Sequence, residues 1–139
     1  MERMPKHKRR AVEDDLRKYP YYKNVLEAMR DEIIYSSNHE VKGMPRGGEQ
    51  TSTTESKAIA LVSQTKYDYI NGIVRMIERV YENLREEDKK LIKLRYFDGR
   101  LTDEGVMMEL NIGYRGGYYA KKNELLQVFG FALGYWYSL

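Results

Sequence analysis

Apolar side chains recur every three or four positions along most of this 139-residue chain, and this spacing limits its fold more than any other feature. The pattern fills two long stretches, residues 11–36 and 53–84, and returns in three shorter ones after residue 85. No stretch shows the strict apolar–polar alternation that is typical of a half-buried β-strand. The sequence therefore predicts an all-α protein.

Charge and composition divide the predicted helical chain into four segments. Residues 1–10 carry a net charge of +4, whereas the rest of the chain sums to −1. The predicted segments are a basic flexible arm (1–10), N-terminal helices with a glycine-rich linker (11–52), a long helix (53–84) and a C-terminal helical region (85–139).

Proline and glycine residues predict where helices begin and end in the segment 11–52. Pro20 disfavours helical geometry in the residue before it, so we predict one helix near 11–18 and another near 20–36. The stretch that contains Gly43, Pro45, Gly47 and Gly48 lacks the spacing of a phosphate-binding loop, and we interpret it as a connector.

The long helix 53–84 carries an apolar stripe that needs a partner. Its members include Ile59, Val62, Tyr69, Ile73, Met76, Val80 and Leu84. The N-terminal helices and the same helix of a second subunit are the two available partners, so a homodimer stays open.

The C-terminal region has the pattern of a helix-turn-helix. Glu86, Glu87 and Asp88 suit the start of a helix that Gly99 ends. Thr102 is predicted to cap a short helix that buries Val106, Met107 and Leu110. The turn 111–113 is expected to need Gly113 for an unusual backbone conformation, and a last helix follows with Gly117, Ala120, Leu125 and Val128 inward.

This assignment leaves basic and aromatic residues on the outer face of the last helix. The predicted DNA-binding residues are Tyr114, Arg115, Tyr118, Tyr119, Lys121 and Lys122, and Lys6, Lys8, Arg9 and Arg10 of the arm are predicted auxiliary phosphate contacts. Arginine can pair with guanine through two hydrogen bonds, and lysine and tyrosine suit phosphate oxygens. The alternative is a three-helix packing unit whose basic helix is merely solvated.

Composition argues against other functions. The chain has no cysteine, and its two histidines lie in the predicted arm and linker, so we expect no metal, no cofactor and no thiol chemistry. The acidic clusters fall at predicted helix starts, where capping explains them, so we expect no enzyme. No apolar run reaches the roughly 20 residues of a membrane span, so we expect no membrane partner. The absence of cysteine fits a reducing compartment, and we expect the protein in the cytoplasm of a bacterial host cell.

Two parts of the chain resemble known families. The stretch LREEDKKLIKLRYFDGRLTDEGVMMELNIGYR resembles region four of bacterial sigma factors. The stretch DDLRKYPYYKNVLEAMRDEII, the Gly47–Gly48 loop and TESKAIALVS resemble RinA/ArpU-type regulators of bacteriophages and prophages. Together the resemblance covers about residues 12–130, and it implies a DNA-binding activator of late genes for packaging, morphogenesis and lysis.

The resemblance carries over residue by residue, with one departure. Arg115 falls where the family often has an arginine, and Lys121 and Lys122 fall on its basic stretch. Gly116 and Gly117 replace the usual threonine and small apolar residue, which predicts a frayed first turn. The last residues are unusually aromatic, so Trp136 and Tyr137 are expected to pack on the body or on another subunit.

The predicted partner is therefore double-stranded DNA. A small terminase-like packaging factor is the alternative within DNA binding. A helical adaptor that binds host RNA polymerase without touching DNA is the alternative from another class.

Overall fold

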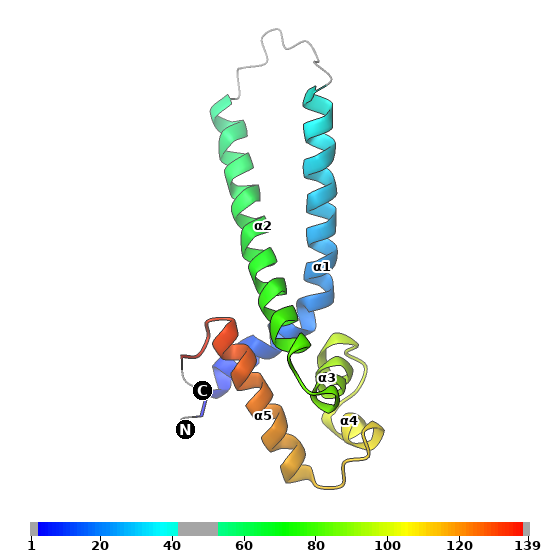
Figure 1. Ribbon diagram of the computed structural model, residues 1–139. Helices are drawn as coiled ribbons and strands as arrows, with labels where there is room; N and C mark the ends of the chain where they lie inside the picture. Colours follow the sequence, from blue (N-terminus) through cyan, green and yellow to red (C-terminus); the bar gives the residue numbers. More distant parts are fainter. Residues whose placement is uncertain (1–2, 42–52, 138–139) are drawn as a thin grey trace. The chain divides into compact units, whose positions relative to one another are not determined.

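The computed structural model describes the backbone of residues 3–41 and 53–137 and the side chains of residues 3–32 and 54–137. Within these ranges the chain is helical and contains no β-strand, which confirms the all-α prediction (Figure 1). The elements are α1 (Lys6–Val41), α2 (Thr53–Glu82), α3 (Glu86–Ile92), a π-helical turn (Lys93–Phe97), α4 (Asp103–Glu109) and α5 (Arg115–Ala132). The predicted glycine-rich linker lies outside the described residues.

None of the helices in the described ranges is both long and apolar enough to cross a membrane. The chain divides into two compact units, which we describe separately. The larger unit comprises Met1–Pro20 and Ile73–Leu139, and the smaller unit comprises Tyr21–Gly72.

Helix α1 continues through Pro20, so the predicted break into two helices is wrong. Proline fits a helix locally because its fixed φ is helical, and the cost arises from the lost hydrogen bond and the strained preceding residue. That preceding residue, Tyr19, is held by tertiary contacts. Its hydroxyl donates to Glu78 Oε2 at 2.6 Å, and its ring centroid lies 4.7 Å from that of Phe97.

The smaller unit is an antiparallel pair made by the second part of α1 and the first part of α2 (Figure 1). Leu26 and Ile70 are its buried apolar residues within the described side chains. Other members of the predicted α2 stripe are exposed, among them Ile59, Val62 and Tyr69. The predicted apolar stripe of α2 is therefore only partly correct. Ile73 is buried as predicted, but in the smaller unit the buried face of α2 contains Ile70 and not Tyr69.

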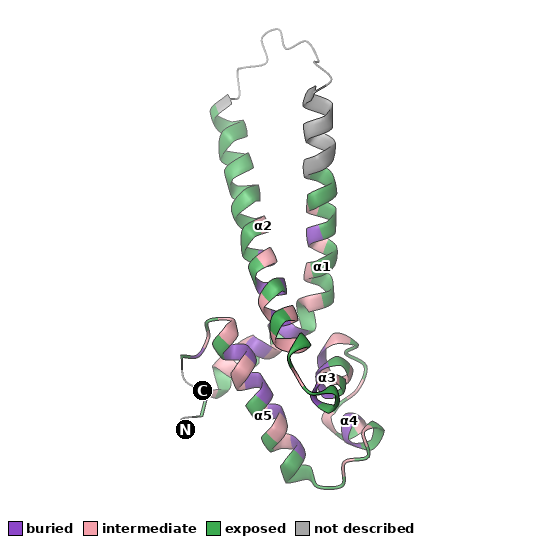
Figure 2. Ribbon diagram, viewed as in Figure 1, coloured by how far each residue is buried: buried purple, intermediate pink, exposed green. Residues whose placement is uncertain are grey.

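The larger unit holds the main core, in which each of the helices α1 to α5 contributes at least one buried residue (Figure 2). Its most completely buried side chains are Val12, Leu16, Ile77, Ile92, Tyr96, Val106, Tyr118, Leu126 and Phe129. Helices α1 and α5 cross closely at Gly130, where an added Cβ would lie 2.8 Å from Met4 Sδ and 3.2 Å from Val12 Cγ2. Only glycine permits this crossing without a shift of its neighbours.

The basic N-terminal segment is folded, so the prediction of a flexible arm is wrong for its described part. Residues from Lys6 onward form the first turns of α1, and Met4 is buried. The tail packs beside them, with Lys8 Nζ 5.5 Å from the ring centroid of Trp136. Trp136 is buried as expected, whereas Tyr137 is exposed, so packing of Tyr137 on another subunit stays a prediction.

Replacing Met4 with alanine should destabilise the larger unit by about 2 kcal/mol, because the truncation leaves a cavity beside Gly130. Met108→Ala is the matched control, since Met4 is 3% exposed and Met108 is 82% exposed. Urea unfolding followed by circular dichroism measures both. Equal midpoints for the two variants would contradict a structural role for the N-terminal segment.

Candidate nucleic-acid interface

Helix α4 begins and ends with regular capping motifs. As predicted, Thr102 is its N-cap, and the Thr102 hydroxyl accepts a hydrogen bond from the Gly105 amide at 3.2 Å. At its end Asn111 adopts a left-handed conformation with φ 62°. The Asn111 amide donates to the Met108 carbonyl at 3.2 Å and the Ile112 amide donates to the Met107 carbonyl at 2.8 Å, which is a Schellman motif.

The turn between α4 and α5 is thus made by Asn111. The prediction that Gly113 takes the unusual conformation is wrong, because Gly113 has no positive φ. Asparagine tolerates the left-handed region better than most other non-glycine residues, so Asn111 in the Asn-Ile-Gly sequence was also a candidate for this conformation. Residues 110–114 connect the two helices, which Figure 1 shows joined by a loop at one end of the larger unit.

Asp103, the first residue of α4, fixes the short helix to α5 and to the π-helical turn. Its Oδ1 accepts hydrogen bonds from Tyr118 Oη at 2.7 Å and from Arg95 Nε at 2.9 Å. Lys122 Nζ lies 3.2 Å from Oδ1 and 3.1 Å from Oδ2 of Asp103. One carboxylate therefore receives donors from three other positions in the core of the unit.

Burial and hydrogen bonding oppose each other at this carboxylate. Burial acts to raise the pKa of Asp103, but the hydrogen bonds from Tyr118, Arg95 and Lys122 outweigh it, so the pKa lies below its usual value. Burial and the acceptor Asp103 raise the pKa of Tyr118, which keeps its hydroxyl protonated as a donor.

The orientation of α5 differs from the predicted one. Tyr118 and Lys122, which were predicted to face outward, are buried, and Tyr118 is only 1% exposed. Gly117 and Ala120, which were predicted to face inward, are exposed, whereas Leu125 is buried as predicted. The prediction failed because it classed tyrosine and lysine as surface residues, and the carboxylate of Asp103 makes their burial favourable.

The double glycine in α5 accommodates the ring of Tyr114. A Cβ at Gly116 would lie 2.9 Å from Tyr114 Cζ and Oη, and a Cβ at Gly117 would lie 3.1 Å from Tyr114 Cδ1. Helix α5 begins at Arg115 and includes both glycines, so the predicted fraying of its first turn is not observed. The glycines let the 76%-exposed Tyr114 fold against the helix backbone.

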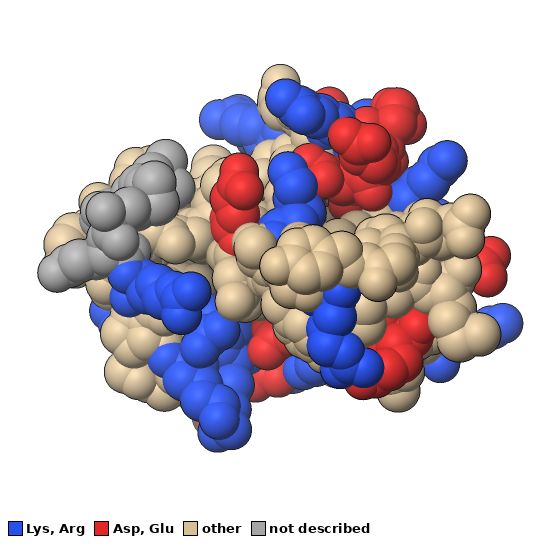
Figure 3. Space-filling model, turned by 90° about the horizontal axis from the view of Figure 1, so that it is seen from below, with Lys and Arg blue, Asp and Glu red and all other residues tan. Residues whose placement is uncertain are grey.

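The outer basic residues of α5 are paired with acidic residues of the same unit. Arg115 Nη1 lies 3.3 Å from Glu104 Oε1, and Lys121 Nζ lies 3.8 Å from Asp88 Oδ2. Tyr119 is half-buried, with its ring edge-on to Tyr118 at 5.3 Å between centroids. Figure 3 shows basic and acidic side chains interspersed over this end of the molecule rather than one continuous basic surface.

The predicted phosphate contacts of the N-terminal segment fall in two places. Lys6, Arg9 and Arg10 line a hollow between α1 and α5, whereas Lys8 lies over Trp136. Sequence reasoning missed Asn123, whose side-chain oxygen accepts a hydrogen bond from Arg9 Nη1 at 3.2 Å. It also missed Asp103. This residue directly follows the N-cap, where an acidic side chain is common because it interacts favourably with the helix dipole.

Within the described residues these features define a helical protein in which Asp103 links the short helix α4 to α5 through Tyr118 and Lys122. The beginning of α5 is exposed. The chain belongs to the DUF722 family, described as a protein of unknown function, which matches residues 15–126. No curated protein and no solved structure matches the chain. The resemblances to RinA/ArpU-type regulators and to sigma factor region four stay predictions.

Asp103→Asn should lower the free energy of unfolding at neutral pH by about 3 kcal/mol, because it leaves the donors around it without a charged acceptor. The lowered pKa stabilises the folded state above the ordinary aspartate value of about 4, and this contribution is lost as the pH falls through the folded-state pKa. Asp103→Asn should therefore reduce the loss of stability in acid.

Unfolding in urea at a series of pH values between neutral and acid measures this dependence. Asp14→Asn serves as the control, because the Asp14 side chain is 62% exposed. An Asp103→Asn variant with the parental pH dependence would show that the cluster around Asp103 does not hold the helices together.

Proposed function

We propose that this protein is a phage-type, sequence-specific DNA-binding transcription regulator, an activator of late genes for packaging, morphogenesis and lysis. The observation that carries the proposal is the α4–α5 pair, in which a braced short helix precedes a longer helix with an exposed beginning. This is the arrangement that helix-turn-helix proteins use to bring a second helix into the major groove.

The first turns of α5 are suited to close contact with a DNA groove. Ala120 is exposed and offers little side-chain bulk, and the ring of Tyr114 lies against Gly116 and Gly117, so the first turn presents a flat aromatic surface to the groove. Arg115 stands at the start of this face and can donate two hydrogen bonds to guanine. The exposed ring of Tyr114 can contact a sugar or a base edge beside it.

Arg115 must leave Glu104 in order to reach a base. The side chains of Arg115 and Glu104 are 64% and 58% exposed, and exposed ion pairs contribute at most about 1 kcal/mol. Breaking the ion pair with Glu104 so that Arg115 can bind a base edge therefore costs little free energy. In our proposal Lys121 contacts a phosphate of the DNA backbone. Tyr118 and Lys122 are buried and support α5 from the core, so they do not touch DNA.

The charge balance of the outer α5 face favours a second candidate, a helical adaptor that binds host RNA polymerase without DNA contact. Arg115 and Lys121 each have an acidic neighbour, which weakens a purely electrostatic attraction to DNA. A gel shift with DNA upstream of the late genes against shuffled DNA separates the candidates. Binding to neither supports the adaptor, and binding to a packaging-site sequence alone supports a terminase-like factor.

Arg115→Ala should weaken binding at the preferred site by about 1–3 kcal/mol and relax the sequence preference, because it removes a base contact. Lys121→Ala should weaken binding to all sequences alike and reduce the salt slope by about one unit. Fluorescence anisotropy with preferred and shuffled duplexes measures both. Parental affinity of Arg115→Ala at the preferred site would exclude α5 as the reading helix.

The exposed apolar residues of α2 predict self-association. Leu61, Val62 and Tyr69 are each more than half exposed, and helix-turn-helix proteins commonly bind two half-sites as dimers. We expect light scattering to give a dimer mass on DNA, and Val62→Lys should shift the protein towards monomer. Gln64→Lys introduces the same positive side chain at another exposed position of α2 and should not do so. A monomer mass at every concentration, with and without DNA, would contradict the dimer.

A further inference from the structure

A basic hollow lies between the beginning of α1 and the middle of α5. It has a volume of about 110 Å³ and is lined by Lys6, Arg9, Arg10, Glu13, Lys122, Asn123 and Leu126. A smaller hollow of about 20 Å³ shares Arg9 and Asn123 with it and adds Arg3, Met4 and Gln127. One water needs about 10–15 Å³ by this measure, so the larger hollow can accept a tetrahedral oxyanion.

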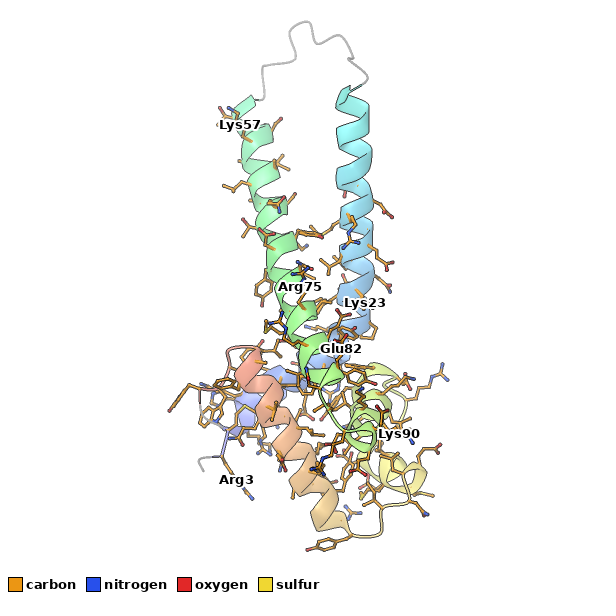
Figure 4. All side chains as sticks on the ribbon, viewed as in Figure 1. Arg3, Lys23, Lys57, Arg75, Glu82 and Lys90 are labelled. Carbon is orange, nitrogen blue, oxygen red and sulfur yellow. The ribbon has the colours of Figure 1, made fainter. Side chains whose placement is uncertain are left out.

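The charge around this hollow is less compensated than that on the outer face of α5. Glu13 is the acidic residue among those that line it, and the Glu13 carboxylate accepts a hydrogen bond from Tyr96 Oη at 2.6 Å. Lys6 and Arg10 are exposed, and so is Arg3, which Figure 4 places beside the start of α1. The hollow therefore combines exposed cations at its rim with a polar floor.

Arg9 and Asn123 form that floor. Arg9 Nη1 donates to Asn123 Oδ1, which ties the first turns of α1 to α5. Arg9 Nε is shielded from solvent and has no hydrogen-bond partner among the described residues. An unsatisfied buried donor is costly, so an anion oxygen in the hollow to which Nε could turn would stabilise this guanidinium.

The hollow lies at a suitable distance from the proposed reading turn. Asn123 follows Arg115 by eight residues, which is about 12 Å along the axis of α5. The major groove of B-DNA is about 8.5 Å deep, and this depth separates the base edges from the level of the phosphates. A helix that places its first turn at the base edges therefore brings its middle to the level of the phosphates at the wall of the groove.

We infer that this hollow binds one phosphate of the DNA backbone and thereby sets the register of α5 in the major groove. The inference rests on the proposed function and deepens it. Lys6 and Arg10 supply the charge, Arg9 supplies a fixed guanidinium, and Asn123 is a positioning residue that holds Arg9. The phosphate contact is part of the folded larger unit, in contrast to a flexible arm that searches for any nearby phosphate.

The test uses the full chain and a fluorescently labelled duplex of unrelated sequence, with anisotropy measured over a series of salt concentrations. Lys6→Gln/Arg10→Gln should reduce the slope of log affinity against log salt by about one unit, because the loss of one phosphate contact removes about 0.9. Lys57→Gln/Lys66→Gln removes the same charge from exposed positions of α2, including Lys57 near its N-terminal end, and should keep the parental slope (Figure 4).

Asn123→Asp separates a binding role from a structural one. Aspartate keeps the acceptor for Arg9, so the urea midpoint should be at least that of the parent, while a negative charge at the floor should lower affinity for every duplex by about tenfold, equivalent to ~1.4 kcal/mol. A variant that folds normally and binds with parental affinity would overturn the inference.

Further outcomes distinguish this inference from the proposed function. A parental salt slope in Lys6→Gln/Arg10→Gln, with Arg115→Ala still losing sequence preference, would overturn the hollow and leave DNA reading by α5 intact. Failure of the parent protein to bind any duplex would overturn both. An Asn123 side-chain amide signal in NMR spectra that moves with inorganic phosphate but not with duplex would assign the hollow to a free anion and overturn the inference.

Discussion

The larger unit depends on the carboxylate of Asp103. A helix as short as α4 is unstable by itself, since too few hydrogen bonds offset the cost of its first turn. Asp103 compensates by accepting hydrogen bonds from Tyr118 and Arg95 and by pairing with Lys122, while Thr102 caps the helix beside it. The angle between α4 and α5 is thus set by directional polar contacts as well as by apolar packing.

This arrangement determines what α5 can offer a partner. Its core side needs Tyr118 and the stem of Lys122, so these two residues are buried and are not part of the outer face of α5. The surface that is left at the first turn is formed by the ring of Tyr114, which lies against Gly116 and Gly117, and by the exposed Arg115. Because Glu104 and Asp88 balance the charges of that surface, the hollow lined by Lys6, Arg9 and Arg10 holds the more available positive charge.

Local sequence signals were sufficient wherever structure depends on neighbouring residues. The cap at Thr102, the acidic start of α3, the left-handed Gly99 after the π-helical turn and the extent of α2 follow from residue types within a few positions. The failures lie where distant residues compensate a local cost. Pro20 continues α1 because Glu78 and Phe97 hold Tyr19, and the N-terminal segment is ordered because Met4 packs at Gly130.

The sequence by itself determined that the chain is helical, because an apolar spacing of three to four residues buries one face only in a helix. It also determined that the positive charge is concentrated at the N-terminus and along the start of α5. Only the tertiary structure decided which of those charged residues stay accessible. Burial of a lysine or tyrosine depends on whether the fold supplies an acceptor, and Asp103 supplies one from a position in the chain that periodicity does not connect to α5.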